Sequence, residues 1–419
     1  MPNRQPTEPT LPQLTHEREI RELYRERNDR SFVVPKHHAR YRWVGELLLI
    51  TVLAVIVSGA VSVSVTSFLQ PFASLPQVAR QPRQAATQAV EPRSEVAGRL
   101  SQATAVLFSA RTAKVGTAVL DQAYLIGEAI GQALVLSSDG WLVTTQAVVP
   151  DTKRAYLAAT GDGSLHAVTQ VVLDPVAPLA YLKVEAQNLA ATAFADYGSL
   201  AAGQPVIATP QLSQGGSRST FVRRLVTLEA LLPASRAELV TTSEELPDRF
   251  LLDDALPRAA LGAPVANLQG EVVGLLAGVG EQARAVVPLD SLATVIDGLF
   301  SASTVRRPIL GVSYAATLAL NQFLPEARAL RQGALLVAGR RPAVVPGSPA
   351  AAAKLQEGDV VLQVQADRVG PRSLSALVAQ YRPGTKLELK VWRQGKERNV
   401  TVTLGEVTAG AKPAAEPKK

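Results

Sequence analysis

The chain has 419 residues, of which 47% are hydrophobic and 19% are charged, and it contains no cysteine. This length is enough for two or three domains, and the lack of cysteine excludes disulfides, thiolate nucleophiles and Cys-ligated metal sites. The net charge of +7 is not gathered into a dense basic run, so nucleic-acid binding is not favoured.

The first 42 residues are polar and are expected to form a cytoplasmic tail. Within Thr15–Arg30 the tail is rich in Arg and Glu, and Ile20, Leu23 and Tyr24 follow helical spacing. A solvated and partly disordered tail is favoured over a partner-binding helix.

An apolar segment follows the tail. Leu47–Leu69 has 23 residues without one charge, long enough to cross a bilayer core of about 30 Å. Basic residues precede it up to Arg42, whereas the next basic residue downstream is Arg80. The sequence therefore predicts a single-pass transmembrane helix over residues 43–70, with the N-terminus inside the cytoplasm and the rest outside. A cleaved signal peptide is the alternative, but the segment is long and lies far from the N-terminus, which favours an uncleaved anchor.

The part of the chain after the apolar segment can be divided into regions by its composition. Residues 71–99, rich in Pro, Gln and Ala, are expected to be a flexible linker. Over residues 100–300, short apolar runs alternate with turn signals, which is typical of an all-β double barrel, and Leu292–Phe300 is expected to be a closing helix. Residues 407–419 are of low complexity and are expected to be a disordered tail.

Several runs in residues 100–300 resemble the HtrA-type serine proteases. GQALVLSSDGWLVTTQAVV at Gly131–Val149 is similar to the segment that holds the family's catalytic histidine, and DPVAPLAYLKV at Asp174–Val184 to the segment that holds its aspartate. LLDDALPRAALGAPVANLQGEVVG at Leu251–Gly274 resembles the nucleophile region, and its second half reads as a hairpin that closes a barrel. The resemblance implies a mostly β chain with a trypsin-like double β-barrel.

The catalytic positions of that family are replaced in this sequence. Placed on the family pattern, the histidine, the aspartate and the serine fall on Ala147, Pro178 and Leu261, none of which can act as base, orienting acid or nucleophile. Of four histidines, three precede the apolar segment, and the fourth, His166, begins a strand, where a surface role is favoured over a catalytic one. A Ser–Lys dyad using Lys183 is also disfavoured, because that lysine alternates with apolar strand neighbours.

Residues 307–406 resemble the PDZ domain, an α+β domain, that follows the protease domain in the family. ILGV at Ile309–Val312 is similar to the carboxylate-binding loop, and SLSALV supplies the groove helix. Such a loop holds a peptide's C-terminal carboxylate with backbone N–H groups while the peptide adds as a strand. The alternative is that the apolar members of this set only pack the domain's own core. The peptide-binding residues implied by the resemblance are Ile309, Leu310, Gly311, Val312, Leu374, Leu377 and Val378.

Three functions follow as hypotheses. The favoured one is a pseudoprotease in the bacterial cytoplasmic membrane that binds protein C-termini or unfolded polypeptide as a scaffold, chaperone or regulator. The resemblance also implies a homo-trimer or a hetero-oligomer with an active relative. The alternatives are an active serine endopeptidase with a non-standard site and a structural envelope protein that binds nothing. Neither a cofactor nor a metal ion is expected, because one exported histidine and scattered carboxylates give no ligand spacing.

Overall fold

The computed structural model describes residues 93–111, 123–212, 219–227, 238–279, 282–323 and 331–413, which all belong to one compact unit, residues 87–419. The expected tail and the expected membrane helix over residues 43–70 lie outside the described residues. None of the helices described within residues 93–413 is long and apolar enough to cross a bilayer.

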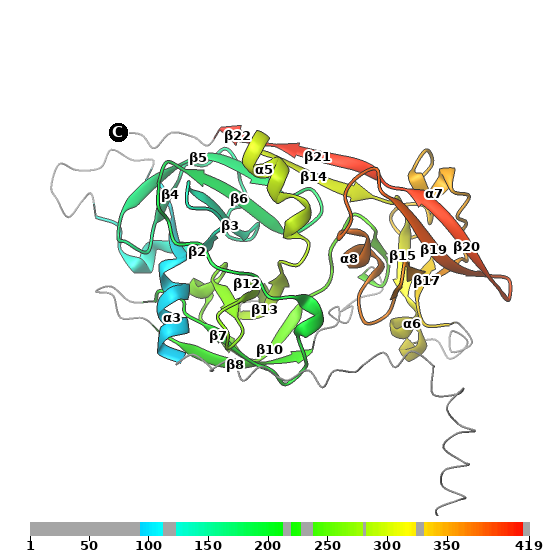
Figure 1. The fold of residues 1–419 in the computed structure, drawn as a ribbon, viewed down its shortest axis with the longest axis horizontal. Coiled ribbons are helices and arrows are strands. Elements are labelled where there is room, and N and C mark those ends of the chain that lie inside the picture. Colours follow the sequence, from blue (N-terminus) through cyan, green and yellow to red (C-terminus); the bar gives the residue numbers. More distant parts are fainter. Residues whose placement is uncertain are drawn as a thin grey trace, which may run out of the picture. The chain divides into compact units, whose positions relative to one another are not determined.

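The first barrel is a sheet of six antiparallel strands whose ends meet, because β5 pairs with β4 along one part of its length and with β6 along another (Figure 1). Its first strand, β1, is buried along almost its whole length by apolar side chains. The strands, in sheet order, are β5 (Leu165–Leu173), β4 (Tyr156–Ala159), β1 (Thr104–Ser109), β2 (Ala129–Val135), β3 (Trp141–Thr145) and β6 (Leu179–Val184).

The second barrel is also closed and has six strands. One apolar core joins the two barrels, since Leu107 and Leu182 of the first cluster with Phe250 and Leu276 of the second. The double barrel expected from the sequence is confirmed, and α5 (Ile296–Ala302) follows it where a closing helix was expected. The strands, in sheet order, are β10 (Phe250–Leu256), β13 (Gln282–Pro288), β12 (Val272–Val279), β11 (Pro264–Ala266), β7 (Pro205–Ala208) and β8 (Phe221–Thr227).

The C-terminal domain is a sheet with short helices, as expected for a PDZ fold (Figure 1). Its sheet runs in the order β20-β19-β17-β16-β15-β9, and β18 pairs with β17. The edge strand β9 (Thr241–Thr242) comes from the barrel part of the chain, which sequence reasoning did not anticipate. The other elements are β15 (Ser313–Ala316), α6 (Thr317–Phe323), β16 (Ala334–Leu336), α7 (Pro349–Ala352), β17 (Val360–Val364), β18 (Asp367–Arg368), α8 (Leu374–Val378), β19 (Lys386–Arg393) and β20 (Lys396–Thr403).

The structure moves two expected boundaries. Helix α3 (Arg93–Gln102) takes up the end of the expected linker, because Val96 and Leu100 lie one helical turn apart and are both buried. The start of the expected disordered tail forms β21 (Gly405–Gly410) and β22 (Lys412–Pro413). Low-complexity composition hid these strands, which are held by main-chain pairing of β21 with β14 (Thr304–Ile309) and of β22 with β5.

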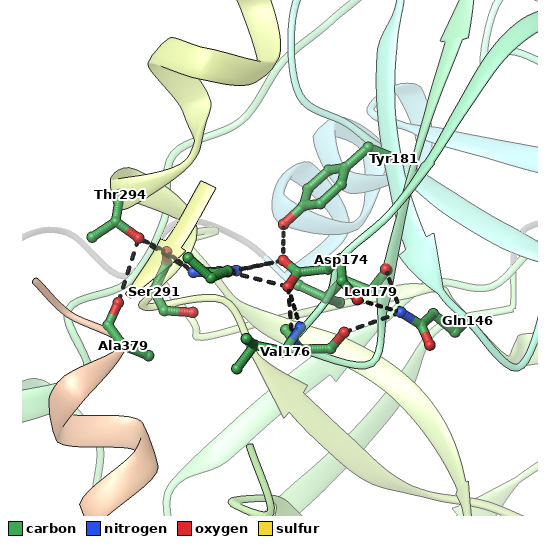
Figure 2. A network of polar contacts seen from close by, with 10 residues as sticks. Gln146, Asp174, Val176, Leu179, Tyr181, Ser291, Thr294 and Ala379 are labelled. Carbon is green, nitrogen blue, oxygen red and sulfur yellow. Dashed lines mark hydrogen bonds and ion pairs between the residues drawn. The ribbon is translucent and has the colours of Figure 1, made fainter. Parts of the chain in front are cut away.

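A buried ion pair fastens β14 to the first barrel. Arg307 and Asp174, both with fully buried side chains, approach to 2.7 Å. Asp174 also accepts a hydrogen bond from the Tyr181 hydroxyl at 3.1 Å and from the backbone N–H of Val176 at 3.0 Å (Figure 2). The strand that leads into the PDZ domain is therefore anchored in the barrel by charge as well as by its backbone.

Candidate functional site

The turn that carries Leu261 lies between β10 and β11. Residues Arg258–Ala260 form a short 3-10 helix, and the N–H of Leu261 donates to the carbonyl of Arg258 at 3.0 Å. The Leu261 side chain is 9% exposed and belongs to the core that joins the barrels. In an acyl-transfer site, N–H groups of such a turn must point at the developing oxyanion. Here the N–H of Leu261 is already used inside the turn.

This turn is locked onto strand β2. The carbonyl of Leu261 accepts a hydrogen bond from the N–H of Gln132 at 2.7 Å. Gly262 has φ of +80°, and a Cβ at this position would lie 2.0 Å from the carbonyl oxygen of Gln132. Only glycine fits both the backbone angle and the close approach. The conformation of the turn is therefore fixed by the sequence around it.

The segments that hold Ala147, Pro178 and Leu261 come together around the start of β2. A Cβ on Gly131 would touch both the Val148 side chain, at 2.7 Å, and the carbonyl of Leu261, at 2.8 Å. The N–H of Gln146 donates to the carbonyl of Pro178 at 2.9 Å. Methyl, pyrrolidine and isobutyl side chains can neither transfer a proton nor attack a carbonyl.

Gln146, next to Ala147, was missed by sequence reasoning. Its side-chain nitrogen donates to the carbonyls of Asp174 at 2.8 Å and of Ala177 and Leu179 at 3.2 Å each (Figure 2). The side-chain amide of Gln146 thus spans the loop around Pro178 and holds it by hydrogen bonds to main-chain carbonyls. The Asp174 carboxylate also holds this loop by accepting from the N–H groups of Val176 and Ala177, and a glutamine beside an alanine gives no signal of the arrangement in the sequence.

The remaining candidate bases lie in structural positions. His166 stands on β5 opposite Ala158, and its Nε2 atom is buried without a hydrogen-bond partner. Lys183 donates to the Asp139 carboxylate at 2.6 Å and lies 5.5 Å from the centre of the Trp141 ring. The hydrogen bond from Lys183 is the main cause that lowers the pKa of Asp139. Lys183 is thus held as an ion-paired cation on the barrel surface.

In the carboxylate-binding loop, Ile309–Val312, two side chains are buried and the glycine adopts a left-handed backbone conformation. Leu310 and Val312 are fully buried in the PDZ core, whereas Ile309 ends β14 half-buried. Gly311 has φ of +82°, and a Cβ there would lie 2.2 Å from Cβ of Ser348. The side chains of Leu310 and Val312 therefore build the core, and any capacity of the loop to bind a carboxylate rests on its backbone N–H groups.

Helix α8 packs more tightly than the sequence indicated. All three of its expected groove residues are buried to within 2% and belong to the apolar core of the domain. These side chains pack in the domain's core, and their role in lining a peptide groove stays a prediction: Leu374, Leu377 and Val378. The polar residue of this helix that faces the edge strand is Ser375, whose hydroxyl donates to the carbonyl of Thr242 at 3.0 Å.

The backbone donors of the loop contact a segment of the barrel part of the chain. The N–H groups of Gly311 and Val312 donate to the Ser243 hydroxyl oxygen at 3.1 and 3.0 Å. The N–H of Gly311 also lies 2.9 Å from a carboxylate oxygen of Glu244. Nothing in the run TTSEE distinguishes these residues from a surface loop, so sequence reasoning could not find them.

Among the described residues, no group of three or more His, Asp or Glu side chains could hold a metal ion.

Comparison with known families assigns both domains. Residues 131–275 match the model of the trypsin-like peptidase domain, and residues 325–404 match that of the PDZ domain. A probable periplasmic serine endoprotease, DegP-like, of Rhizobium meliloti is 30% identical over 297 residues, which are 68% of this chain and 55% of that protein. The namesake of Chlamydia muridarum is 30% identical over 290 residues, 67% of this chain and 54% of that protein. The chain thus spans about half the length of these curated relatives.

Solved structures show the same fold. The HtrA-type protease AlgW with a decapeptide superposes with a TM-score of 0.53 at 21% identity, covering 75% of this chain and 99% of that one. AlgW with a tripeptide gives a TM-score of 0.52 at 21% identity, over 75% of this chain and 97% of that one. The two domain matches in this order and the DegP-like relatives place the chain in the HtrA-type protease family, with a trypsin-like peptidase domain followed by a C-terminal PDZ domain, and the solved structures show the same fold.

Proposed function

We propose that this chain is a catalytically inactive HtrA-type protein that binds polypeptide through its PDZ domain. The observation that carries the proposal is the turn at Leu261. A buried isobutyl group stands where the nucleophile is expected, and the N–H that would stabilise an oxyanion donates to Arg258 within the turn. With Ala147 and Pro178 at the other two expected positions, three roles of the triad are lost together.

Peptide binding is supported by the backbone of the PDZ domain. Binding of a C-terminal carboxylate needs main-chain N–H groups and the edge of a strand, here β15, and it does not depend on the identity of a reactive side chain. Gly311 and Val312 direct their N–H groups to anionic and hydroxyl oxygens in this structure. Two of the similar structures are of an HtrA-type protease with a decapeptide and with a tripeptide.

We further propose that the protein works outside the cytoplasmic membrane, anchored by residues 43–70. The curated relatives are called periplasmic serine endoproteases, and the charge distribution around the apolar segment favours an external C-terminal part. In that place the protein would serve envelope protein quality control as a scaffold, a chaperone or a regulator. A homo-trimer or a mixed oligomer with an active relative fits each of these roles.

Two assays on the purified full chain test the proposal. Incubation with casein and with a fluorophosphonate probe is expected to give neither hydrolysis nor covalent labelling. Labelling that disappears when one serine is replaced would establish the alternative, an active endopeptidase with a non-standard site. An array of ten-residue peptides with free C-terminal carboxylates is expected to yield binders that Gly311→Glu loses. An array without binders would instead favour a structural protein.

A further inference from the structure

The PDZ sheet is completed by a strand from the barrel part of the same chain. Strand β9 pairs antiparallel with β15, with Thr242 opposite Ser313 and Thr241 opposite Tyr314. The N–H of Ser243 continues this pairing by donating to the carbonyl of Val312 at 2.9 Å. An added antiparallel strand at this edge is the way in which a PDZ domain receives a peptide.

The same segment also reaches the carboxylate-binding donors. The Ser243 hydroxyl oxygen accepts from both Gly311 and Val312, and the Glu244 carboxylate accepts from Gly311. Ser243 is 2% exposed, so water is excluded from these contacts. A hydroxyl and a carboxylate from side chains thus occupy the place where the terminal carboxylate of a peptide would bind.

The opposite side of the segment is held by the groove helix. The Ser375 hydroxyl on α8 donates to the carbonyl of Thr242 at 3.0 Å, and a second hydrogen bond, of 2.7 Å, links Ser375 to the Tyr314 hydroxyl on β15. Upstream, a Cβ on Gly339 would lie 2.8 Å from the Val240 side chain, so this residue packs against the loop after β16. The segment is therefore enclosed by strand, loop and helix.

We propose that residues 241–244 are an internal ligand of the PDZ groove, and that a partner polypeptide binds only by displacing them. This inference rests on the proposed peptide-binding function and names its regulation. The partner is an extended chain with a free C-terminal carboxylate, because that anion can replace both the Ser243 hydroxyl and the Glu244 carboxylate at the donors of Gly311 and Val312.

Displacement is coupled to the barrel through the chain itself. The segment runs on through Asp248 into β10, the strand before the turn of Leu261. Asp248 accepts a hydrogen bond from the N–H of Ser373, the cap residue of α8, at 3.2 Å. An incoming peptide therefore separates a barrel segment from the PDZ groove. Its apparent affinity is reduced by the fraction of molecules in which the groove is closed.

Cysteine crosslinking tests whether the segment occupies the groove in solution. The natural chain has no cysteine, so an introduced pair is the only thiol pair. Residues directly opposite in an antiparallel pair have Cα atoms about 4.5–5.5 Å apart, within the range of a disulfide. Thr242→Cys with Ser313→Cys is expected to form a disulfide, whereas Thr241→Cys with Ser313→Cys, off register by one residue, is expected to form about tenfold less or none. Equal crosslinking of the two pairs, or none in either, would overturn the inference.

Hydrogen exchange gives a second measurement that needs no ligand. Ser243→Pro removes both the N–H that donates to Val312 and the accepting hydroxyl, so exchange at the amides of Gly311 and Val312 is expected to rise about tenfold or more in the full chain. Glu245→Ala is the matched control, because this exposed carboxylate contacts Thr241 and not the PDZ loop. Unchanged exchange in Ser243→Pro would contradict internal occupancy.

Peptide binding then separates this inference from the proposed function. Each protein is probed with the same peptide array. Ser243→Pro is expected to bind array peptides about tenfold or more tightly than the natural chain, and the oxidised Thr242→Cys, Ser313→Cys protein to bind none until it is reduced. Equal binding by the oxidised and the reduced protein would overturn the displacement step. Failure of every form to bind would refute the peptide-binding function, while crosslinking and exchange still decide whether the groove is occupied.

Discussion

The turn at Leu261 and the loop at Ile309–Val312 both resemble segments of the same family. The chemistry expected of the turn depends on side chains, whereas the binding expected of the loop depends on backbone groups. The first needs a hydroxyl, an imidazole and a carboxylate, so under the proposed function its chemistry is lost with Ala147, Pro178 and Leu261 while the barrel around it persists. The second needs N–H groups, which nearly every residue supplies, so it keeps its capacity when side chains change. Under the proposed function, this chain therefore keeps recognition where catalysis is lost.

The two sites also satisfy their donors differently. The N–H of Leu261 donates to a carbonyl three residues earlier in its own turn, a local contact with which no ligand competes. The N–H groups of Gly311 and Val312 donate to Ser243, far away in the sequence, and the contact can be exchanged for one with another chain. The N–H of Leu261 is therefore satisfied within its own turn, whereas the N–H groups of Gly311 and Val312 are satisfied by a segment that a peptide can replace.

The largest loss of stability is expected from breaking the buried ion pair between Arg307 and Asp174, which joins β14 to the first barrel. Burial is the largest single influence and acts to lower the pKa of Arg307, but the charge of Asp174, its hydrogen bonds and the contact with Tyr181 together outweigh burial, so the pKa is raised and the guanidinium stays ionised. Arg307→Ala leaves Asp174 as an unpaired buried charge and should lower the free energy of unfolding by about 3–5 kcal/mol in urea denaturation. The neighbour Arg306→Ala, which breaks an exposed pair with Glu406, should cost far less, because solvent screens that pair. Similar losses for both variants would contradict this account.

A smaller loss of stability is expected from Leu261→Ser, which tests whether a serine alone can restore reactivity to the barrel site. Leu261→Ser should lower the free energy of unfolding by about 2–3 kcal/mol, because buried apolar contacts are lost. It should not react with a fluorophosphonate, because the expected base and acid positions hold Ala147 and Pro178. Leu261→Ala, with a similar loss of packing and no hydroxyl, is the control. Labelling of the serine variant alone would show that a base remains near this turn.

Sequence reasoning reached the fold because apolar alternation and turn residues specify strands locally. It could not find the groove occupant, because pairing of β9 with β15 depends on main-chain groups that every residue carries. It also took Val407–Pro413 as disordered, since Gly, Ala and Lys mask strands that are held by partners elsewhere in the chain. Leu374, Leu377 and Val378 lie on a helix as expected and pack in the core, and spacing alone cannot tell whether they also form a groove wall.

A third prediction concerns the glycine of the PDZ loop. Gly311→Ala introduces a Cβ at positive φ that also meets Ser348, whereas at Gly347, with φ of +75°, nothing lies within 4 Å of the added atom. Both variants bear backbone strain, but Gly311→Ala should be less stable than Gly347→Ala by about 1–2 kcal/mol and should lose array binding. Thermal or urea unfolding compares the two. Equal stability with retained binding in both would show that the loop tolerates a shifted backbone.

The smallest effect on the free energy of unfolding is expected from lowering the pH. It tests the pairing of β21 with β14, the strand that leads into the PDZ loop. Hydrogen bonds from Arg306 are the main cause that lowers the pKa of Glu406 from 4.5 to about 2. A carboxylate with a lowered folded-state pKa contributes stability above its unfolded pKa, and this contribution is lost as the pH falls from about 4.5 towards 2. The unfolding free energy should therefore drop in this window, and Glu406→Gln should remove that part of the slope. Because both side chains are partly exposed, the slope should also shrink in high salt. A slope that Glu406→Gln leaves unchanged would place the acid sensitivity in other carboxylates, and the β14–β21 pair would then depend on its backbone bonds alone.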